Sequence, residues 1–308
     1  DIVISTVQSF TYQNKYKREF KPNSFDLVIS DEAHRSLGQR SRNVFEYFIG
    51  FKLGLTATPR DFLKSVNPDD MSMTDPKELE RRLMLDTYSI FGCDNGEPTY
   101  RYTLTDGVKD GFLINPKVID VVTGLSADMM SKEGLSFKGV DKDGNDVEEE
   151  TFHKKDFERK FKSRETNLSF CDAFIKSAER DPFSNEIGKT LVFCVSQKHA
   201  TRITEILNEL AEKYFPSQYQ SDFAIQVTSN VTKPEPQQMT IDFKNNNLRG
   251  NSLVNEVYKT SKARVCVTVG MMTTGYDCKD LLNICLFRPV FSPTEFIQMK
   301  GRGTRLFD

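Results

Sequence analysis

Two adjacent carboxylates, Asp31 and Glu32, follow the apolar run Leu27, Val28 and Ile29, with a single serine between the run and the acids. Such a run is typical of a buried strand in a parallel sheet, and ligands of open α/β sheets collect at the carboxyl ends of the strands. In nucleotide-hydrolysing motors, the first acid of such a pair holds Mg²⁺ beside the phosphates and the second accepts a proton from the attacking water. We therefore interpret Asp31 as the metal anchor and Glu32, beside the same ion, as the base.

The same segment, Asp-Glu-Ala-His, also fits the first turn of a helix, because acidic residues are favoured at helix N-termini and alanine is a good helix former. A second polar segment follows the apolar run 51–55, where Thr56 and Thr58 provide two hydroxyls. These hydroxyls can link the water beside the acid pair to a second domain through hydrogen bonds. A plain turn is the alternative there, since Pro59 disfavours helix at Thr58 and ends a strand.

Two arginines close the chain, Arg302 and Arg305, after a helix predicted to begin near Pro293. Guanidinium groups suit phosphate oxygens, and this spacing lets both arginines reach one phosphate cluster. An arginine supplied to the γ-phosphate from another domain accelerates hydrolysis by about 10³ to 10⁵. An exposed basic helix end is the alternative.

The first residues suggest contacts to nucleic acid. Residues 2–4 are predicted to be a strand, and Thr6 and Gln8 at its end can hydrogen-bond phosphates. The alternative is a helix N-cap at Ser5 or Thr6. The segment Tyr12–Lys21 mixes basic and aromatic residues and can contact a nucleic-acid strand, although a solvated helix face is the commoner reason for such a pattern.

Composition describes an ordinary globular protein, with 308 residues, 38% hydrophobic and 28% charged, and its length suits about two domains. No apolar run is long enough to cross a membrane. The formal net charge of -2 gives no support to nucleic-acid binding, so any basic surface must be local. The six cysteines form no C-x-x-C pair, and we expect free thiols in a reducing cytosol rather than a zinc site.

Strand and helix patterns alternate as in an α/β fold with parallel sheets flanked by helices. Strands are predicted at 117–122, 190–195, 223–228 and 264–269, with a strand-like run at 99–102, and helices at 75–91, 155–178 and 200–211. We divide the chain into a first domain at 1–123, a linker or insertion at 124–153 with a hairpin near Asp143 and Gly144, and a second domain at 154–308.

One phosphate-loop match is rejected. Gly188, Lys189 and Thr190 spell the end of such a loop, but Phe183 stands where a glycine is needed, and the run opens a strand instead of a helix. Since the chain starts at Asp1 and not at a methionine, we expect a first domain truncated before its phosphate-binding loop.

Six segments in order resemble the motor motifs of superfamily two helicases: I-S-T-V-Q-S-F, S-D-E-A-H-R-S, G-L-T-A-T-P-R, T-L-V-F-C-V, V-G-M-M-T-T-G-Y-D and Q-M-K-G-R-G-T-R-L. The words D-E-A-H-R-S, T-Y-R-Y-T-L-T-D-G-V-K-D-G-F-L and F-I-Q-M-K-G-R-G-T-R-L resemble the R subunit, which is the motor and nuclease, of Type I restriction enzymes. The resemblance covers nearly the whole chain.

This resemblance implies two RecA-like domains with ATP and Mg²⁺ between them, double-stranded DNA along one face, and methyltransferase (M) and specificity (S) subunits as partners. Residue by residue, it implies the following roles: Asp31 and Glu32 for Mg²⁺ and water activation; Thr56 and Thr58 for coupling; Gly275 and Asp277 beside the nucleotide; Gln298, Arg302 and Arg305 in the arginine-finger motif; and Thr6, Gln8, Thr273 and Thr274 for DNA contact.

Two alternatives stay open. One is a Type III restriction subunit or another superfamily two helicase, which strand displacement of a short duplex would favour. The other is a non-catalytic DNA-binding or assembly module, because the phosphate-binding loop is missing from the sequence. We expect residues 1–308 alone to hydrolyse little or no ATP, and robust turnover by the purified chain would contradict this.

Overall fold

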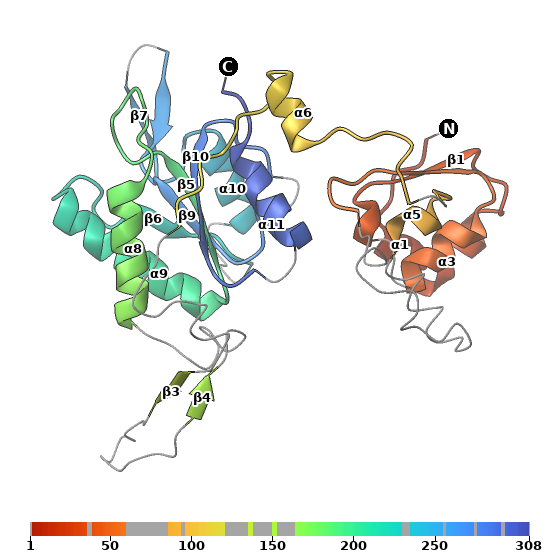
Figure 1. The fold of residues 1–308 in the computed structure, drawn as a ribbon, viewed down its shortest axis with the longest axis horizontal. Coiled ribbons are helices and arrows are strands. Elements are labelled where there is room, and N and C mark those ends of the chain that lie inside the picture. Colours follow the sequence, from red (N-terminus) through yellow and green to blue (C-terminus); the bar gives the residue numbers. More distant parts are fainter. Residues whose placement is uncertain are drawn as a thin grey trace. The chain divides into compact units, whose positions relative to one another are not determined.

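The computed structural model of the chain divides into two compact units, Asp1–Thr103 and Leu104–Asp308 (Figure 1). The structure describes residues 2–35, 39–59, 86–93, 96–120, 135–137, 150–152, 164–229, 235–254, 257–273, 276–290 and 293–307.

The first unit is built on two parallel strands, β1 (Leu27–Ser30) and β2 (Phe51–Gly54), with Leu27 opposite Phe51. Val28 packs towards the buried side chains Tyr16, Val44 and Phe48. These come from helices on one face of the strands. The helical elements described in this unit are α1 (Val7–Thr11), η1 (Tyr12–Asn14), α2 (Lys15–Glu19), η2 (Ala33–Arg35), α3 (Gln39–Tyr47) and α5 (Thr87–Ile90).

The two strands are confirmed, but their predicted burial is wrong for one face. Leu27, Ile29 and Phe51 are 50%, 57% and 84% exposed. Alternate residues of a strand point to opposite faces, and the helices described in this unit cover the face of Val28. The apolar run therefore predicted the strand correctly, but it predicted burial on both faces where one face is exposed.

The second unit contains a four-stranded parallel sheet in the order β10-β5-β9-β6. Its strands are β5 (Lys189–Cys194), β6 (Ala224–Gln226), β9 (Val265–Thr268) and β10 (Leu281–Phe287). All six residues of β5 are buried, as expected for an inner strand of a sheet covered on both faces.

Helices lie on both faces of this sheet (Figure 1). Val192 and Cys194 of β5 pack with side chains of α8 (Arg164–Ser177) and α9 (Gln197–Tyr214). Leu191 and Phe193 face the other way and pack with side chains of α10 (Pro236–Lys244) and with Met299 of α11 (Pro293–Lys300). The strand alternation of β5 thus builds a three-layer α/β unit.

Smaller elements complete this unit. The helix α6 (Leu104–Lys109) leads to Ile114, whose amide donates to the Thr304 carbonyl at 2.7 Å, so this segment is attached to the end of the chain. Antiparallel pairs are formed by β3 (Leu135–Phe137) with β4 (Glu150–Phe152), and by β7 (Asn251–Leu253) with β8 (Lys259–Ser261). A last turn, η6 (Gly301–Gly303), follows α11.

The predicted strands at 190–195, 223–228 and 264–269 are confirmed, as are the helix at 200–211 and the helix after Pro293. The pair β3 and β4 flanks the predicted hairpin turn at 143–144, which lies outside the described residues. Only part of each predicted helix at 75–91 and 155–178 is described, as α5 and α8. The α/β class with parallel sheets flanked by helices is confirmed.

Other predicted strands are wrong. Residues 2–4 and 99–102 form no strand, and neither do 117–120, the described part of 117–122. Ile2, Tyr100 and Val118 are 92%, 80% and 71% exposed. A strand requires hydrogen bonds to a neighbouring strand, and none of the described strands pairs with these segments.

The domain boundaries stay predictions; the compact units divide between Thr103 and Leu104, whereas the sequence placed the first boundary after residue 123. Lys189 is not a phosphate-loop lysine, as predicted. Lys189 is the first residue of β5; it is 2% exposed, and its ammonium group pairs with the Asp280 carboxylate at 2.9 Å. The six cysteines are all free thiols, also as predicted.

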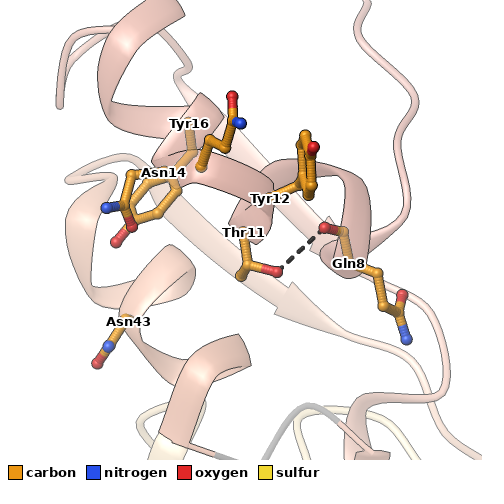
Figure 2. Close-up of a pocket in the computed structure, with 7 residues that line it drawn as sticks. Gln8, Thr11, Tyr12, Asn14, Tyr16 and Asn43 are labelled. Atoms are coloured by element: carbon orange, nitrogen blue, oxygen red, sulfur yellow. Dashed lines mark hydrogen bonds between the residues drawn. The ribbon is translucent and has the colours of Figure 1, made fainter.

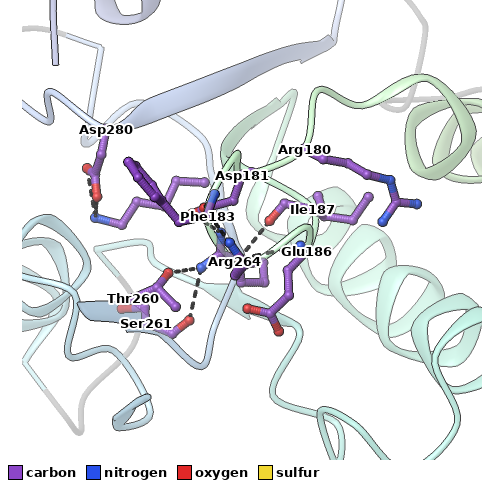
Figure 3. A network of polar contacts seen from close by, with 12 residues as sticks. Arg180, Asp181, Phe183, Glu186, Ile187, Thr260, Ser261, Arg264 and Asp280 are labelled. Carbon is purple, nitrogen blue, oxygen red and sulfur yellow. Dashed lines mark hydrogen bonds and ion pairs between the residues drawn. The ribbon is translucent and has the colours of Figure 1, made fainter. Parts of the chain in front are cut away.

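A buried polar network fastens β9 to its surroundings (Figure 3). Arg264 is fully buried and donates to the Ile187 carbonyl at 2.7 Å, to the Thr260 hydroxyl and to Asp181 at 3.2 Å. Burial acts to raise the pKa of the Asp181 carboxyl, but the Tyr258 hydroxyl, the Ser184 and Phe183 amides and the Arg264 charge together lower it. The carboxylate therefore remains ionised and compensates the buried guanidinium.

We expect Asp181→Ala to lower the free energy of unfolding of the second unit by about 3–5 kcal/mol, because it leaves the Arg264 charge buried and unpaired. Denaturant unfolding of the chain measures this loss. The control is Glu209→Ala, which breaks the exposed pair with Arg164 and should cost about 1 kcal/mol or less. Equal losses in the two variants would contradict the role given to the network.

Candidate functional site

The carboxyl ends of β1 and β2 hold the first group of candidate residues. The Leu55 amide donates to the Ser30 carbonyl at 2.8 Å, and the Ala33 amide donates to the Leu55 carbonyl at 2.9 Å. These bonds continue the parallel pairing beyond the strands. They place the segment of Asp31 and Glu32 beside the segment that begins at Thr56.

His34 connects the two segments. Its side chain is 2% exposed, and its Nδ1 atom lies 2.8 Å from the Thr56 hydroxyl, 3.5 Å from the Thr58 hydroxyl and 3.4 Å from the Glu32 carboxylate. The Thr56 hydroxyl also accepts the Thr58 amide at 3.1 Å. The structure therefore brings Glu32, Thr56 and Thr58 together around one imidazole.

His34 is a residue that the sequence analysis missed. The Asp-Glu-Ala-His run contains it, but no role was assigned to it, because neither the apolar pattern nor the residue spacing shows which side chain lies between two loops. The imidazole joins Glu32 to the two threonines. The predicted link through these hydroxyls, from the water beside the acid pair to a second domain, stays a prediction.

The two acids differ in their surroundings. Asp31 is exposed, and one of its oxygens accepts the Glu32 amide at 2.9 Å. Glu32 has a φ of 49°, in the left-handed region that non-glycine residues rarely adopt, and its side chain is 33% exposed. This backbone turn directs the two carboxylates differently, whereas the first turn of a regular helix, the alternative interpretation, has no residue with positive φ.

Mg²⁺ would fit at Asp31. Magnesium is commonly held by one or two carboxylates together with waters and substrate phosphates, and Asp31 offers an accessible carboxylate for this. Among the described residues no group of three or more His, Cys, Asp or Glu side chains forms a metal cage.

The second unit holds the other group, at the carboxyl end of β9 and after α11. The Arg305 Nε atom pairs with Asp277 at 2.7 Å, and its Nη1 atom donates to the Tyr276 carbonyl at 3.2 Å. Arg302 donates to the same carbonyl at 2.7 Å and to the Thr273 carbonyl at 3.2 Å. Both arginines therefore contact the loop that carries Asp277, and their predicted reach to one phosphate cluster stays a prediction.

Arg302 lies within the η6 turn, and Arg305 follows two residues after this turn ends. The backbone of Arg305 forms an isolated antiparallel bridge with Leu113. A side chain at Gly303 would approach Ile284 to 3.0 Å, so the close packing of η6 on β10 favours glycine there.

Helix α10 fixes the loop from the other side. The Tyr276 hydroxyl donates to the Thr240 carbonyl at 3.1 Å, and burial, followed by the neighbouring Cys278 and Cys266 thiols, raises the pKa of that hydroxyl, which stays protonated. Lys244 reaches the second oxygen of Asp277 at 3.8 Å. Asp277 thus lies between two cations, and the sequence analysis had not assigned Lys244 to the site.

The remaining predicted residues are placed as follows. Gln298 lies on α11 and is 7% exposed. The Thr273 hydroxyl donates to the Gly270 carbonyl at 3.0 Å, and its side chain is 9% exposed. Thr6 caps α1, its hydroxyl accepting the Ser9 amide at 3.1 Å, and Gln8 is exposed on the same helix. Thr274 and Gly275 lie outside the described residues.

The N-cap alternative for Thr6 is therefore confirmed, and the DNA-contact roles of these residues stay predictions. The closing of the two groups on one triphosphate also stays a prediction. Within the described residues no helix is long and apolar enough to cross a membrane.

Known proteins resemble this chain along most of its length. A family profile described as "Type III restriction enzyme, res subunit" matches residues 1–61. The endonuclease subunits of the Type I restriction enzymes EcoKI from Escherichia coli strain K12 and EcoAI from Escherichia coli are 29% and 27% identical to the chain, each over 99% of it. The chain spans only 24% and 33% of the lengths of these two relatives.

A solved structure agrees with this. It is a fragment of a protein described as an HsdR subunit of a type I restriction enzyme from Vibrio vulnificus YJ016, with 27% identity and a TM-score of 0.55 over 96% of this chain and 44% of that one. The predicted resemblance is confirmed: over nearly its whole length, the chain is a homologue of the endonuclease (R) subunits of Type I restriction enzymes.

Proposed function

We propose that the chain is the motor region of a Type I restriction endonuclease subunit, in which ATP hydrolysis between two RecA-like domains moves double-stranded DNA. The observation that carries this proposal is that each unit gathers its candidate residues at the carboxyl ends of parallel strands. One unit holds two carboxylates, and the other holds two arginines. Phosphoryl transfer to water uses carboxylates to hold the metal and accept a proton, and guanidinium groups to stabilise the charge on the phosphate.

In this proposal Asp31 anchors Mg²⁺, which would neutralise charge on the phosphates, and Glu32 accepts the proton of the attacking water. His34 holds the Glu32 carboxylate and the hydroxyls of Thr56 and Thr58 in one cluster. A change at the Glu32 carboxylate is therefore felt by both threonines through a single side chain. This gives Thr56 and Thr58 a physical means of coupling.

The arginines act from the second domain. Arg305 is held by a half-exposed carboxylate and one backbone carbonyl, so it can exchange Asp277 for a phosphate at small cost. Arg302, with Gln298 beside it on α11, anchors the loop through backbone carbonyls. Closure of the domains on the nucleotide completes the site, and hydrolysis lets them part, while Gly275 and Asp277 stay beside the nucleotide.

DNA and protein partners belong to the same proposal. Thr6, Gln8, Thr273 and Thr274 contact the DNA backbone, the M and S subunits supply assembly and sequence recognition, and the complex works in the cytoplasm, where free thiols persist. The nuclease activity named in the relatives belongs to the whole subunit, a Type I site-specific deoxyribonuclease. The motor proposed here moves DNA without necessarily separating its strands.

The Type III alternative has one observation in its favour, the match of that family profile to residues 1–61. The Type I relatives align with 99% of the chain, which favours the Type I assignment. Displacement of one strand from a short duplex with free ends would support a helicase instead of a translocase.

We expect Glu32→Gln to lower the DNA-stimulated ATP turnover of the full-length protein by about 10² to 10⁴, because an amide cannot accept the proton of the attacking water. The measurement is phosphate release at saturating duplex DNA. Glu46→Gln, an exposed glutamate on α3 in the same unit, is the matched control and should leave turnover unchanged. Undiminished turnover in Glu32→Gln would remove the assignment of the base.

We expect Arg305→Ala to lower ATP turnover by about 10³ to 10⁵, because the charge that develops on the phosphate loses its guanidinium partner. Nucleotide and DNA affinities should change much less, since the loss falls on the transition state. Arg164→Ala, at a side chain that is 61% exposed in the same unit, provides the comparison. Similar turnover in both variants would show that Arg305 is not the arginine finger.

A further inference from the structure

A polar pocket opens in the first unit where α1, η1 and α2 meet α3. It has a volume of about 430 Å³ and is lined by Gln8, Thr11, Tyr12, Gln13, Asn14, Tyr16 and Asn43. Figure 2 shows Asn43 on α3 and the side chains of Gln8, Thr11 and Tyr12 on and beside α1. Volumes of about 300–1,000 Å³ are usual for sites that hold small molecules.

The lining defines the chemistry of a ligand. None of the seven residues carries a charge; amide side chains come from Gln8, Gln13, Asn14 and Asn43. In the described part of the chain, the side-chain amides of Gln8, Asn14 and Asn43 have no protein hydrogen bond. A neutral group that both donates and accepts hydrogen bonds fits such a lining, whereas a metal ion or an isolated phosphate does not.

Two tyrosines add flat surfaces. Tyr12 is 69% exposed at the rim, and Tyr16 is 3% exposed and packs edge-on against Tyr47 at the base. An exposed tyrosine beside polar amides is suited to stacking a planar ring. The partner that fits is therefore planar as well as rich in hydrogen-bonding groups.

The backbone at the pocket is strained. Gln13 and Asn14 have φ values of 49° and 54°, two consecutive non-glycine residues in the left-handed region. Such conformations cost free energy, and they are concentrated at ligand-binding sites. The turn separates α1 from α2, and Arg18 supports it with a bond to the Gln13 side-chain oxygen at 3.4 Å.

Cations are frequent in the part of the sequence that forms the uncharged pocket. Residues 7–25 contain Lys15, Lys17, Arg18 and Lys21 against a single acid, Glu19, although the whole chain has a net charge of -2. The Lys17 ammonium lies 5.5 Å from the centre of the Tyr16 ring. A ligand with a neutral planar part and negative groups on either side matches this arrangement, and a nucleotide within a strand is such a ligand.

We propose that this pocket binds one unstacked base of a single-stranded segment of nucleic acid. Tyr12 stacks on the base, the amides of Gln8, Asn14 and Asn43 bond to its edge, and the lysines bind the flanking phosphates. The inference deepens the proposed function and rests on it, because Gln8 is among the predicted DNA contacts. It adds a base-binding site to contacts that otherwise involve the backbone alone.

The experiment compares two strands that bind the 308-residue chain: a single-stranded oligodeoxynucleotide of mixed sequence and a strand of equal length made of abasic units. Fluorescence anisotropy measures both affinities at one salt concentration, without ATP. We expect the base-bearing strand to bind about 5- to 100-fold more tightly, the range that stacking of a base on an aromatic ring provides. Phosphate contacts are common to both strands and cancel in this ratio.

Three variants locate the effect. Tyr12→Ala should bring the ratio close to one while leaving the salt dependence unchanged, because the phosphate contacts remain. Tyr12→Phe keeps the ring and should keep the ratio. Tyr100→Ala, which removes another tyrosine of the first unit that is 80% exposed, is the matched control and should also keep it. Unfolding midpoints verify that the variants remain folded.

Equal affinity of the unaltered chain for both strands, absence of binding, or an equal loss in Tyr100→Ala would overturn the proposal. This result can be told apart from a failure of the motor proposal, because the binding measurement contains neither ATP nor duplex DNA. If the ratio is one but Glu32→Gln abolishes ATP turnover, the pocket assignment fails and the motor stands. If the ratio is high and the Glu32 carboxylate proves dispensable, the base site stands alone.

Discussion

Hydrogen bonds that continue beyond the ends of two parallel strands organise the first unit. The amides of Leu55 and Ala33 extend the pairing of β1 and β2 into the loops, and the loops thereby lie side by side. Because the strands are parallel, both loops leave the same edge of the sheet. Without this pairing, His34 could not contact Glu32 and Thr56 together, since the two loops are separated by more than twenty residues of chain. The surroundings of the acid pair therefore depend on the backbone hydrogen bonds between the two loops.

In the second unit, a covered parallel sheet holds the loop of the candidate site in place. The burial of β5 and the Arg264 network hold the strands, and the loop after β9 then offers backbone carbonyls to two guanidinium groups. Arg302 donates to two carbonyls of this loop and to the Gln298 carbonyl of α11, whereas Arg305 has one loop carbonyl and the half-exposed Asp277. A surface ion pair contributes about 0–1 kcal/mol, so its exchange for a phosphate is inexpensive. In the proposed motor, Arg305 is consequently the arginine that exchanges its partner, and Arg302 is the one that positions the loop.

Local patterns predicted the strands that carry the site, because apolar runs followed by polar residues mark strand ends. They did not predict that β10 pairs with β5, which joins Leu281 to Lys189 across more than ninety residues, and the run at 281–287 was not identified as a strand. Residues 2–4 show the opposite error: the apolar pattern was present, but no described strand pairs with it. His34 escaped notice for a related reason. Its role comes from two loops meeting in space, which residue spacing does not reveal.

Net charge and nucleic-acid binding need not conflict in this chain. At physiological salt, charges separated by more than about 8 Å are largely screened, so a strand of nucleic acid responds to the residues nearest to it. The cations of residues 7–25 outnumber Glu19 four to one, while the chain as a whole is acidic. Long-range steering is then weak, and affinity must come from short-range contacts. In the proposed base site, an exposed Tyr12 beside uncharged amides would supply such contacts, and these would be insensitive to salt. Contacts of this kind to a base would persist at salt concentrations where lysine contacts to phosphate weaken. This is a reason for a base pocket to lie near the lysines.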